Sequence, residues 1–127
     1  MSWQQYVDDT LIGSGKVAKA AILGHDGSIW ASTPDFKIPP AEGQKLEQAF
    51  TSTDDIAANG LYLLSKKYIY LRKPQENVIY AREGSNGVVC YKSSQCVIIG
   101  YYDEHHSAGN CNQIVENLGD YLLAQGF

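Results

Sequence analysis

Two large aromatic side chains stand three residues apart at the start of the chain. Trp3 and Tyr6 lie within MSWQQYVDD, a segment compatible with a helix over positions 1 to 9. Because residues three apart share one face of a helix, the two rings should lie side by side on a short amphipathic helix. Ser2 is placed to cap that helix, with Gln5 three residues later in the capping-box position. Large rings at a chain end need either a docking surface in the protein or a ligand.

The far end of the chain supplies further aromatic side chains. A helical pattern runs through LGDYLLAQGF at positions 118 to 127, and Trp30 lies on a predicted strand beside a hairpin. Chain ends are often close in space, so helices at both ends can lie side by side. We call the resulting set the aromatic strip: Trp3, Tyr6, Trp30, Tyr121 and Phe127.

Any one of these rings alone would be expected in the core. Their concentration at the two termini favours a surface groove instead. Parallel rings form grooves that fit proline rings, and a stiff polyproline II segment loses little entropy on binding. The indole N–H and tyrosine hydroxyls would donate hydrogen bonds to its carbonyls.

Basic side chains gather in the middle of the chain. The 127 residues include 10 Lys and Arg against 14 Asp and Glu, a net charge of -4, which argues against nucleic acid as a partner. A solvated sheet edge protected by Lys would explain the basic stretch, and so would a locally basic binding face. Six of the ten basic residues lie between positions 66 and 92: Lys66, Lys67, Arg72, Lys73, Arg82 and Lys92.

Other candidate sites lack essential parts. The run 103 to 106 (Asp-Glu-His-His) has metal-ligand side chains, but adjacent residues rarely point to one centre. The run 13 to 16 (Gly-Ser-Gly-Lys) lacks the spacing of a phosphate loop and is typical of a helix stop. No third group completes a nucleophilic site around Cys111 with His105 and His106. We therefore expect no metal, no cofactor and no enzymatic activity.

The cysteines and overall composition indicate the class of protein. Cys90, Cys96 and Cys111 show no paired spacing, and we see no signal peptide and no apolar run near membrane-spanning length. These features predict a cytoplasmic protein with reduced thiols, of which Cys90 and Cys96 should be buried. The length fits one domain over residues 1 to 127.

The predicted elements describe an α+β fold. Closely spaced strands favour an antiparallel meander, because parallel strands need long crossovers. We expect a central antiparallel sheet of about six to seven strands, with the N- and C-terminal helices together on one face and shorter helices on the other. The predicted strands are 17–23, 28–32, 61–64, 67–72, 77–82, 87–92 and 95–102, and the other helices are 40 to about 50, one after Thr53 that stops at Gly60, and one capped by Ser107.

These motifs together resemble the profilin family of small actin-monomer-binding proteins. The likeness starts with Ser-Trp-Gln-x-Tyr-x-Asp directly after the initiator Met and covers essentially the whole chain. It continues through Ile29-Trp30-Ala31, an LR turn at Leu71-Arg72, Ile79-Tyr80, Gly87-Val88-Val89 and the ending IVENLGDYLLAQGF.

The resemblance implies a protein that binds monomeric actin and proline-rich (poly-L-proline) segments, and that regulates actin polymerisation and nucleotide exchange on actin. It assigns the poly-L-proline site to the aromatic strip. It also implies a monomer associated with the cytoskeleton, with proline-rich partners such as formins and with weak phosphoinositide binding at Arg72, Lys73 and Arg82. The implied actin contacts are Lys67, Tyr70, Arg72, Arg82, His106, Gly109, Asn112, Gln113 and Asn117.

Three positions depart from the family pattern. Phe127 lacks the hydroxyl of the Tyr with which many relatives end. Glu83 stands where relatives often have a second basic residue, and Ala108 replaces a common Pro ahead of the last helix. These departures keep an alternative open, a proline-motif-binding adaptor with weak or lost actin binding.

Overall fold

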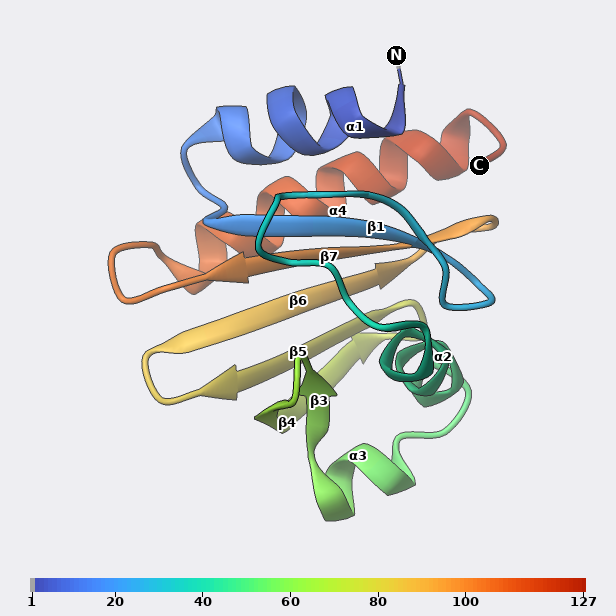
Figure 1. Ribbon diagram of the computed structural model, residues 1–127, viewed down its shortest axis with the longest axis vertical. Helices are drawn as coiled ribbons and strands as arrows, with labels where there is room; N and C mark the ends of the chain where they lie inside the picture. Colours follow the sequence, from blue (N-terminus) through green and yellow to red (C-terminus); the bar gives the residue numbers. More distant parts are fainter. Residues whose placement is uncertain (1) are drawn as a thin grey trace.

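A seven-stranded antiparallel sheet runs through the molecule (Figure 1). The structure is a computed structural model and describes residues 2–127, so Met1 of the predicted first helix lies outside the described residues. Strand order is β2-β1-β7-β6-β5-β4-β3, and every neighbouring pair is antiparallel. The strands are β1 Lys19–Gly24, β2 Ile29–Ser32, β3 Leu61–Leu63, β4 Lys66–Gln75, β5 Val78–Glu83, β6 Asn86–Lys92 and β7 Cys96–Tyr102.

Helices cover both faces of this sheet. The N-terminal segment comprises α1 Trp3–Gln5, η1 Tyr6–Leu11 and η2 Ile12–Ser14, and it packs with α4 Ala108–Ala124 on one face. Helices α2 Pro40–Ala49 and α3 Asp54–Asn59 cover the other face. The predicted α+β architecture is confirmed. Among residues 2–127, no helix combines the length and apolar character needed to cross a membrane.

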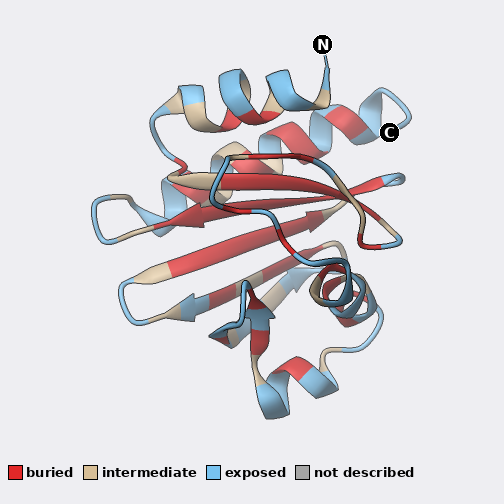
Figure 2. Ribbon diagram, viewed as in Figure 1, coloured by how far each residue is buried: buried red, intermediate tan, exposed pale blue. Residues whose placement is uncertain are grey.

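Two apolar cores lie on opposite sides of the sheet, and buried positions are concentrated in the strands (Figure 2). Leu46 and Ile56 bring α2 and α3 into the first core. Val7, Val115 and Leu122 bring the two terminal helices into the second. Strand residues alternate between the faces, so one sheet serves both cores.

The N-terminal helical segment is longer and less regular than the sequence predicts. The capping box is present, because the Gln5 N–H donates to the Ser2 hydroxyl and the Ser2 N–H donates to the Gln5 side chain. After one α-turn the chain widens into a π-helical stretch over η1, where the Ile12 N–H is shared between the carbonyls of Val7 and Asp8. The segment ends at Gly15, whose φ of +75° suits a residue without a side chain.

The predicted LR turn at Leu71-Arg72 is wrong. Both residues lie inside β4, which continues to Gln75. Pairing of β4 with β5 shifts register between Tyr70 and Arg72, and again between Arg72 and Gln75. Pro74 lacks an N–H and cannot complete a regular ladder, so irregular pairing accommodates it where the sequence pattern predicts a chain reversal.

Gly119 allows α4 to lie directly on β6. A Cβ atom at this position would meet the Tyr91 ring at 2.3 Å. We expect Gly119→Ala to displace that buried ring and to destabilise the fold by about 2 kcal/mol, as overpacking of a core does. Thermal unfolding measures the effect. Gly109→Ala is the matched control on the same helix, because its Cβ would have no neighbour nearer than 3.7 Å, and an equal melting temperature for all three proteins would contradict the prediction.

Candidate functional site

The structure brings all five residues of the aromatic strip together. The Trp3 ring lies at the centre, with centroid distances of 5.0 Å to Trp30, 5.8 Å to Tyr6 and 5.8 Å to Phe127. The Tyr6 ring extends the series to Tyr121 at 6.5 Å. Residues from both ends of the chain and from an edge strand therefore form one continuous row of rings.

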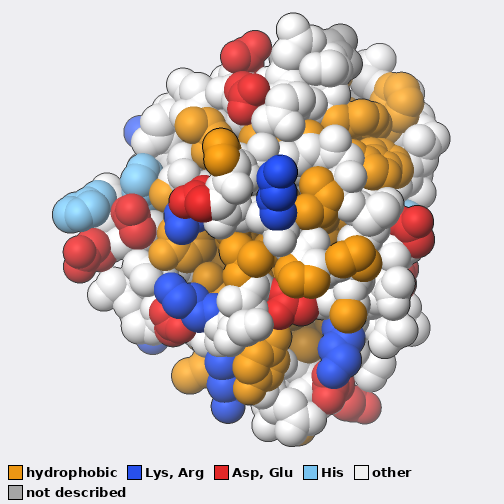
Figure 3. Space-filling view, in the orientation of Figure 1, with side chains coloured by type: hydrophobic (Ala, Val, Ile, Leu, Met, Phe, Trp, Pro, Cys, Tyr) orange, Lys and Arg blue, Asp and Glu red, His pale blue; other side chains and the backbone are white. Residues whose placement is uncertain are grey.

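The aromatic strip is a surface rather than a core. Trp30, Tyr121 and Phe127 are 38%, 51% and 41% exposed, and the rings of Trp3 and Tyr6 are half-buried. Figure 3 shows hydrophobic side chains gathered at the upper right, where the two chain ends lie. Beyond Tyr6 the surface continues as a groove of about 320 Å³ lined by Tyr6, Thr10, Ile114, Asn117, Leu118 and Tyr121.

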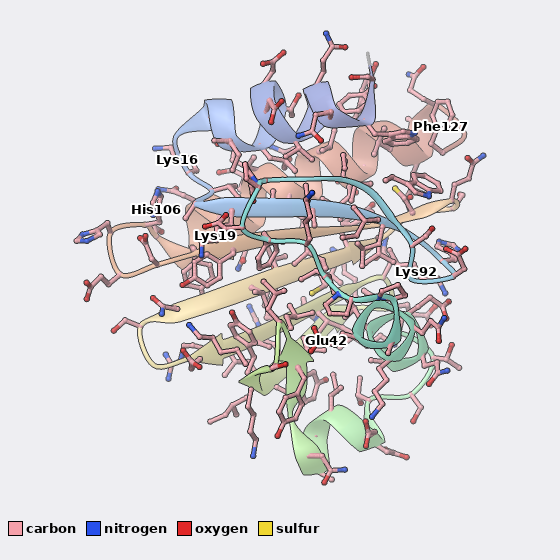
Figure 4. All side chains as sticks on the ribbon, viewed as in Figure 1. Lys16, Lys19, Glu42, Lys92, His106 and Phe127 are labelled. Carbon is pink, nitrogen blue, oxygen red and sulfur yellow. The ribbon has the colours of Figure 1, made fainter. Side chains whose placement is uncertain are left out.

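Phe127 is held in place by the turn between β6 and β7. Its carbonyl oxygen accepts hydrogen bonds from the Ser93 hydroxyl at 2.9 Å and from the Gln95 N–H at 2.6 Å. Ser93 is buried, and its Oγ also accepts from the Cys96 N–H. Figure 4 shows Phe127 beside the end of α4, at the opposite end of the molecule from His106. These anchors were not predictable from the sequence, since a Ser-Ser-Gln turn carries no signal for its distant partner.

Gln4 fastens the N-terminal helix to the edge strand that carries Trp30. Its Nε2 donates to the Ser32 carbonyl at 3.0 Å and to Asp8 Oδ1 at 3.0 Å, and its Oε1 accepts from the Ser32 N–H at 3.4 Å. The side-chain amide thus replaces a strand partner for the open edge of β2. These bonds fix Trp3 against Trp30, a role of Gln4 that was not predicted from the sequence either.

We expect Gln4→Ala to weaken binding of a proline-rich ligand several-fold, because the Trp3 and Trp30 rings lose their common support. Two ordinary hydrogen bonds together contribute about 1 to 2 kcal/mol to the stability of this arrangement. The affinity for poly-L-proline measures the effect. Gln5→Ala is the control, since the Gln5 side chain bonds only the Ser2 N–H within the described residues, and an equal loss in both variants would contradict a specific role for Gln4.

A second surface carries exposed residues of β4 and β5, and Tyr80 on β5 links it to α4. The Tyr80 hydroxyl donates to Glu116 Oε2 at 2.6 Å, and burial together with this hydrogen bond raises the pKa of Tyr80 to about 12. The Arg72 guanidinium lies 5.3 Å from the Tyr80 ring centre, and exposed Arg82 pairs across the ladder with Ile69. We use the name β4–α4 face for the exposed residues Ile69, Leu71, Arg72 and Arg82 of β4 and β5 together with the expected contacts Gly109, Asn112 and Gln113 of α4.

Four of the nine expected actin contacts pack against or bond other parts of the described chain. Tyr70 is half-buried against the core under α2 and α3. The Lys67 side chain packs over Gly60 at the end of α3, and His106 Nδ1 bonds Asp103 at 2.7 Å in the loop before α4. Asn117 lines the groove beside Tyr6 and Tyr121.

The three expected phosphoinositide residues are also not brought together. The Lys73 ammonium group donates to the Phe50 carbonyl at the end of α2, away from Arg72 and Arg82. Glu83, whose charge departs from the family pattern, lies 3.7 Å from Lys66. That ion pair partly compensates the negative charge at the end of β5.

A family model described as profilin matches residues 1–127. The chain belongs to the profilin family. Profilin-1A of Acanthamoeba castellanii is 45% identical over 127 residues, which cover 100% of each chain. The crystal structure of Acanthamoeba castellanii profilin II matches with a TM-score of 0.95 at 42% identity, over 99% of this chain and 100% of that one. Mouse profilin IIa, solved in complex with a double repeat from the FH1 domain of mDia1, matches with a TM-score of 0.80 over 100% of both chains, and at 24% identity this likeness shows the fold alone.

This member of the profilin family exposes two apolar side chains that were not predicted from the sequence as surface residues. Ile69 and Leu71 on β4 are 64% and 49% exposed, beside Arg72. One signal was available in the sequence. Successive side chains of a strand point to opposite faces of the sheet, so Ile69 must face away from the side that Tyr68 and Tyr70 face. Exposed apolar groups beside arginines are typical of an interface.

The profilin thiols lie inside the protein. Cys90, Cys96 and Cys111 are free and buried, as the sequence predicts for the first two. Burial raises the pKa of Cys90 and Cys96, and that of Cys111 to about 12. Thiols with such pKa values stay protonated and are poor nucleophiles.

The loop over residues 103 to 106 carries the other candidate metal ligands. Hydrogen bonds from His106 and from the His105 N–H lower the pKa of Asp103. Within residues 2–127, no group of three or more His, Cys, Asp or Glu side chains is arranged to hold a metal ion.

Proposed function

We propose that this protein binds proline-rich segments on the aromatic strip and an actin monomer on the β4–α4 face, and so regulates actin polymerisation. The observation behind this proposal is the row of exposed rings assembled from residues 3, 6, 30, 121 and 127. Such a row is costly to leave in water without a ligand. Membership of the profilin family supports the same function.

The chemistry of the strip suits a polyproline II ligand. Proline rings fit between aromatic rings, and the ligand carbonyls have no internal hydrogen-bond partners. The indole N–H of Trp3 or Trp30 and the hydroxyls of Tyr6 and Tyr121 are donors of the right kind. The mouse profilin complex with an FH1 repeat supports formins as one class of partner.

The β4–α4 face suits an acidic protein partner. Arg72 and Arg82 would make charge-assisted hydrogen bonds to actin carboxylates, while Ile69 and Leu71 would supply apolar contact. Nucleotide exchange on actin would follow from a higher affinity for an open actin cleft, with no catalytic group from this chain. We place the protein in the cytoplasm with the cytoskeleton, and assign any phosphoinositide binding, which should be weak, to Arg72 and Arg82.

A second candidate is a proline-motif adaptor that does not bind actin. Glu83 favours it, because a carboxylate at the end of β5 would meet an acidic partner. The ion pair between Glu83 and Lys66 reduces this repulsion and so weakens the case for the adaptor. A pull-down with monomeric actin separates the two candidates, since the adaptor would retain poly-L-proline binding and show no actin.

Titration with poly-L-proline, followed by intrinsic tryptophan fluorescence, tests the proposal directly. Both tryptophans of the protein, Trp3 and Trp30, lie in the strip, so bound ligand must change their environment. We expect a saturable change. No change in a sample shown to be folded would overturn proline binding.

A further inference from the structure

The aromatic strip lies among acidic side chains. The segments that carry it, residues 2–14, 29–32 and 108–127, contain Asp8, Asp9, Glu116 and Asp120 and no Lys or Arg. Figure 3 shows acidic side chains over the N-terminal helical segment. Glu116 bonds Tyr80 beneath Arg72 on the β4–α4 face, so the negative charge at the strip comes from the other three carboxylates.

Most of these carboxylates accept hydrogen bonds from neutral donors, which carry no positive charge to compensate them. Asp8 accepts from the Gln4 amide, Glu116 from the Tyr80 hydroxyl and Asp120 from the Tyr91 hydroxyl. Asp9 is exposed, and within the described part of the chain no side chain bonds its carboxylate. The last turn of α4 also has no basic residue, so its C-terminal carbonyls add partial negative charge beside Phe127.

Basic side chains offset this charge at Glu116, through Arg72, and lysines do so little elsewhere on the strip. Figure 4 shows Lys16 and Lys19 at the opposite end of the molecule from Phe127. Lys19 pairs with Asp35 at 3.2 Å, and Lys92 pairs with Glu47 at 2.7 Å. Two further titratable groups of the described residues lie near the strip: His25, whose Nε2 donates to the Ser93 carbonyl at 3.0 Å, and Asp26, whose carboxylate and the Trp30 indole nitrogen both lie within 3 Å of the place a Cβ of Gly24 would take.

We infer that the strip selects proline-rich segments flanked by Lys or Arg over those flanked by Asp or Glu. This inference rests on the proposed function and deepens it. Proline itself is neutral, so the rings alone cannot distinguish one proline run from another. Cationic flanking residues gain from the acidic surroundings and can also lie over exposed rings such as Tyr121, whereas acidic flanks are repelled.

The test compares three synthetic peptides with the same proline core, flanked by Lys, Ser or Glu. At about 0.01 M salt, where the Debye length is about 30 Å, we expect the Lys-flanked peptide to bind about three- to tenfold more tightly than the Glu-flanked peptide. At about 1 M salt the preference should disappear, because the Debye length falls to about 3 Å.

Two matched variants assign the effect to its source. Asp9→Asn should reduce the preference about twofold, while Asp55→Asn, an exposed acid on α3 at the other face, should leave it unchanged. Equal affinities for the three peptides, or a preference that Asp9→Asn does not alter, would overturn the inference and leave the proposed function standing. Failure of the Ser-flanked peptide to bind would overturn the proposed function itself, and the inference with it.

Discussion

Trp3→Ala should remove most binding of poly-L-proline and leave actin binding nearly intact. Trp3 is the ring that contacts three others, Tyr6, Trp30 and Phe127, so its loss divides the strip into separate pieces. Central aromatic anchors of an interface contribute about 2 to 4 kcal/mol on truncation, which corresponds to roughly 30- to 1,000-fold in Kd. Calorimetric titration with poly-L-proline, and sedimentation with monomeric actin, measure the two activities.

Trp3→Phe is the matched control. It keeps a ring at the centre of the strip and removes the indole N–H, so its affinity should lie between those of the wild-type protein and Trp3→Ala. If Trp3→Ala lost actin binding to the same extent as proline binding, the N-terminal helix would have a general structural role, and two separate binding surfaces would be the wrong description.

Arg72→Glu should have the converse effect. The Arg72 side chain is exposed on the β4–α4 face, over the Tyr80 ring. Reversing its charge opposite an acidic partner should cost about 2 kcal/mol or more, roughly 30-fold in affinity for actin. Poly-L-proline binding should be unchanged. Because the side chain is exposed, the free energy of unfolding should stay within about 0.5 kcal/mol of the wild-type value.

Two further variants make this result specific. Arg72→Lys keeps the positive charge and should lose little actin affinity, whereas Lys45→Glu places the same charge reversal on α2, at the other face of the sheet, and should lose none. A large fall in melting temperature for Arg72→Glu would instead identify Arg72 as a structural residue. Full actin binding by that variant would favour the adaptor.

Local signals in the sequence were sufficient for most of the fold. Gly27, with a φ of +89°, lies in the turn of the hairpin that was predicted beside Trp30, and Pro40 begins α2 at the position that suits proline. Ser107 caps α4 as expected. Spacing within the first helix was sufficient to place Trp3 and Tyr6 side by side, whereas Trp30 joins them from β2 and Phe127 from beyond the end of α4.

Features that depend on distant partners were not predictable in this way. Ser93 and Gln4 act on residues 34 and 28 positions away, and neither residue type indicates its target. The register shifts in β4 change the direction of side chains along the strand, so an expected surface that placed Tyr70 beside Arg72 differs from the one the structure has. Pairing with β5, rather than any local preference, decides those directions.

Because the strip includes residues 3 and 127, ligand binding should also stabilise the two terminal segments of the chain. A proline-rich segment bound across these rings would contact both ends of the chain and would therefore oppose their separation. By mass action, such a ligand at 100 times its Kd raises the unfolding free energy by about 2.7 kcal/mol. Fraying of either terminal helix then becomes rarer while the ligand is bound, so the occupied protein should be more resistant to proteases than the free one.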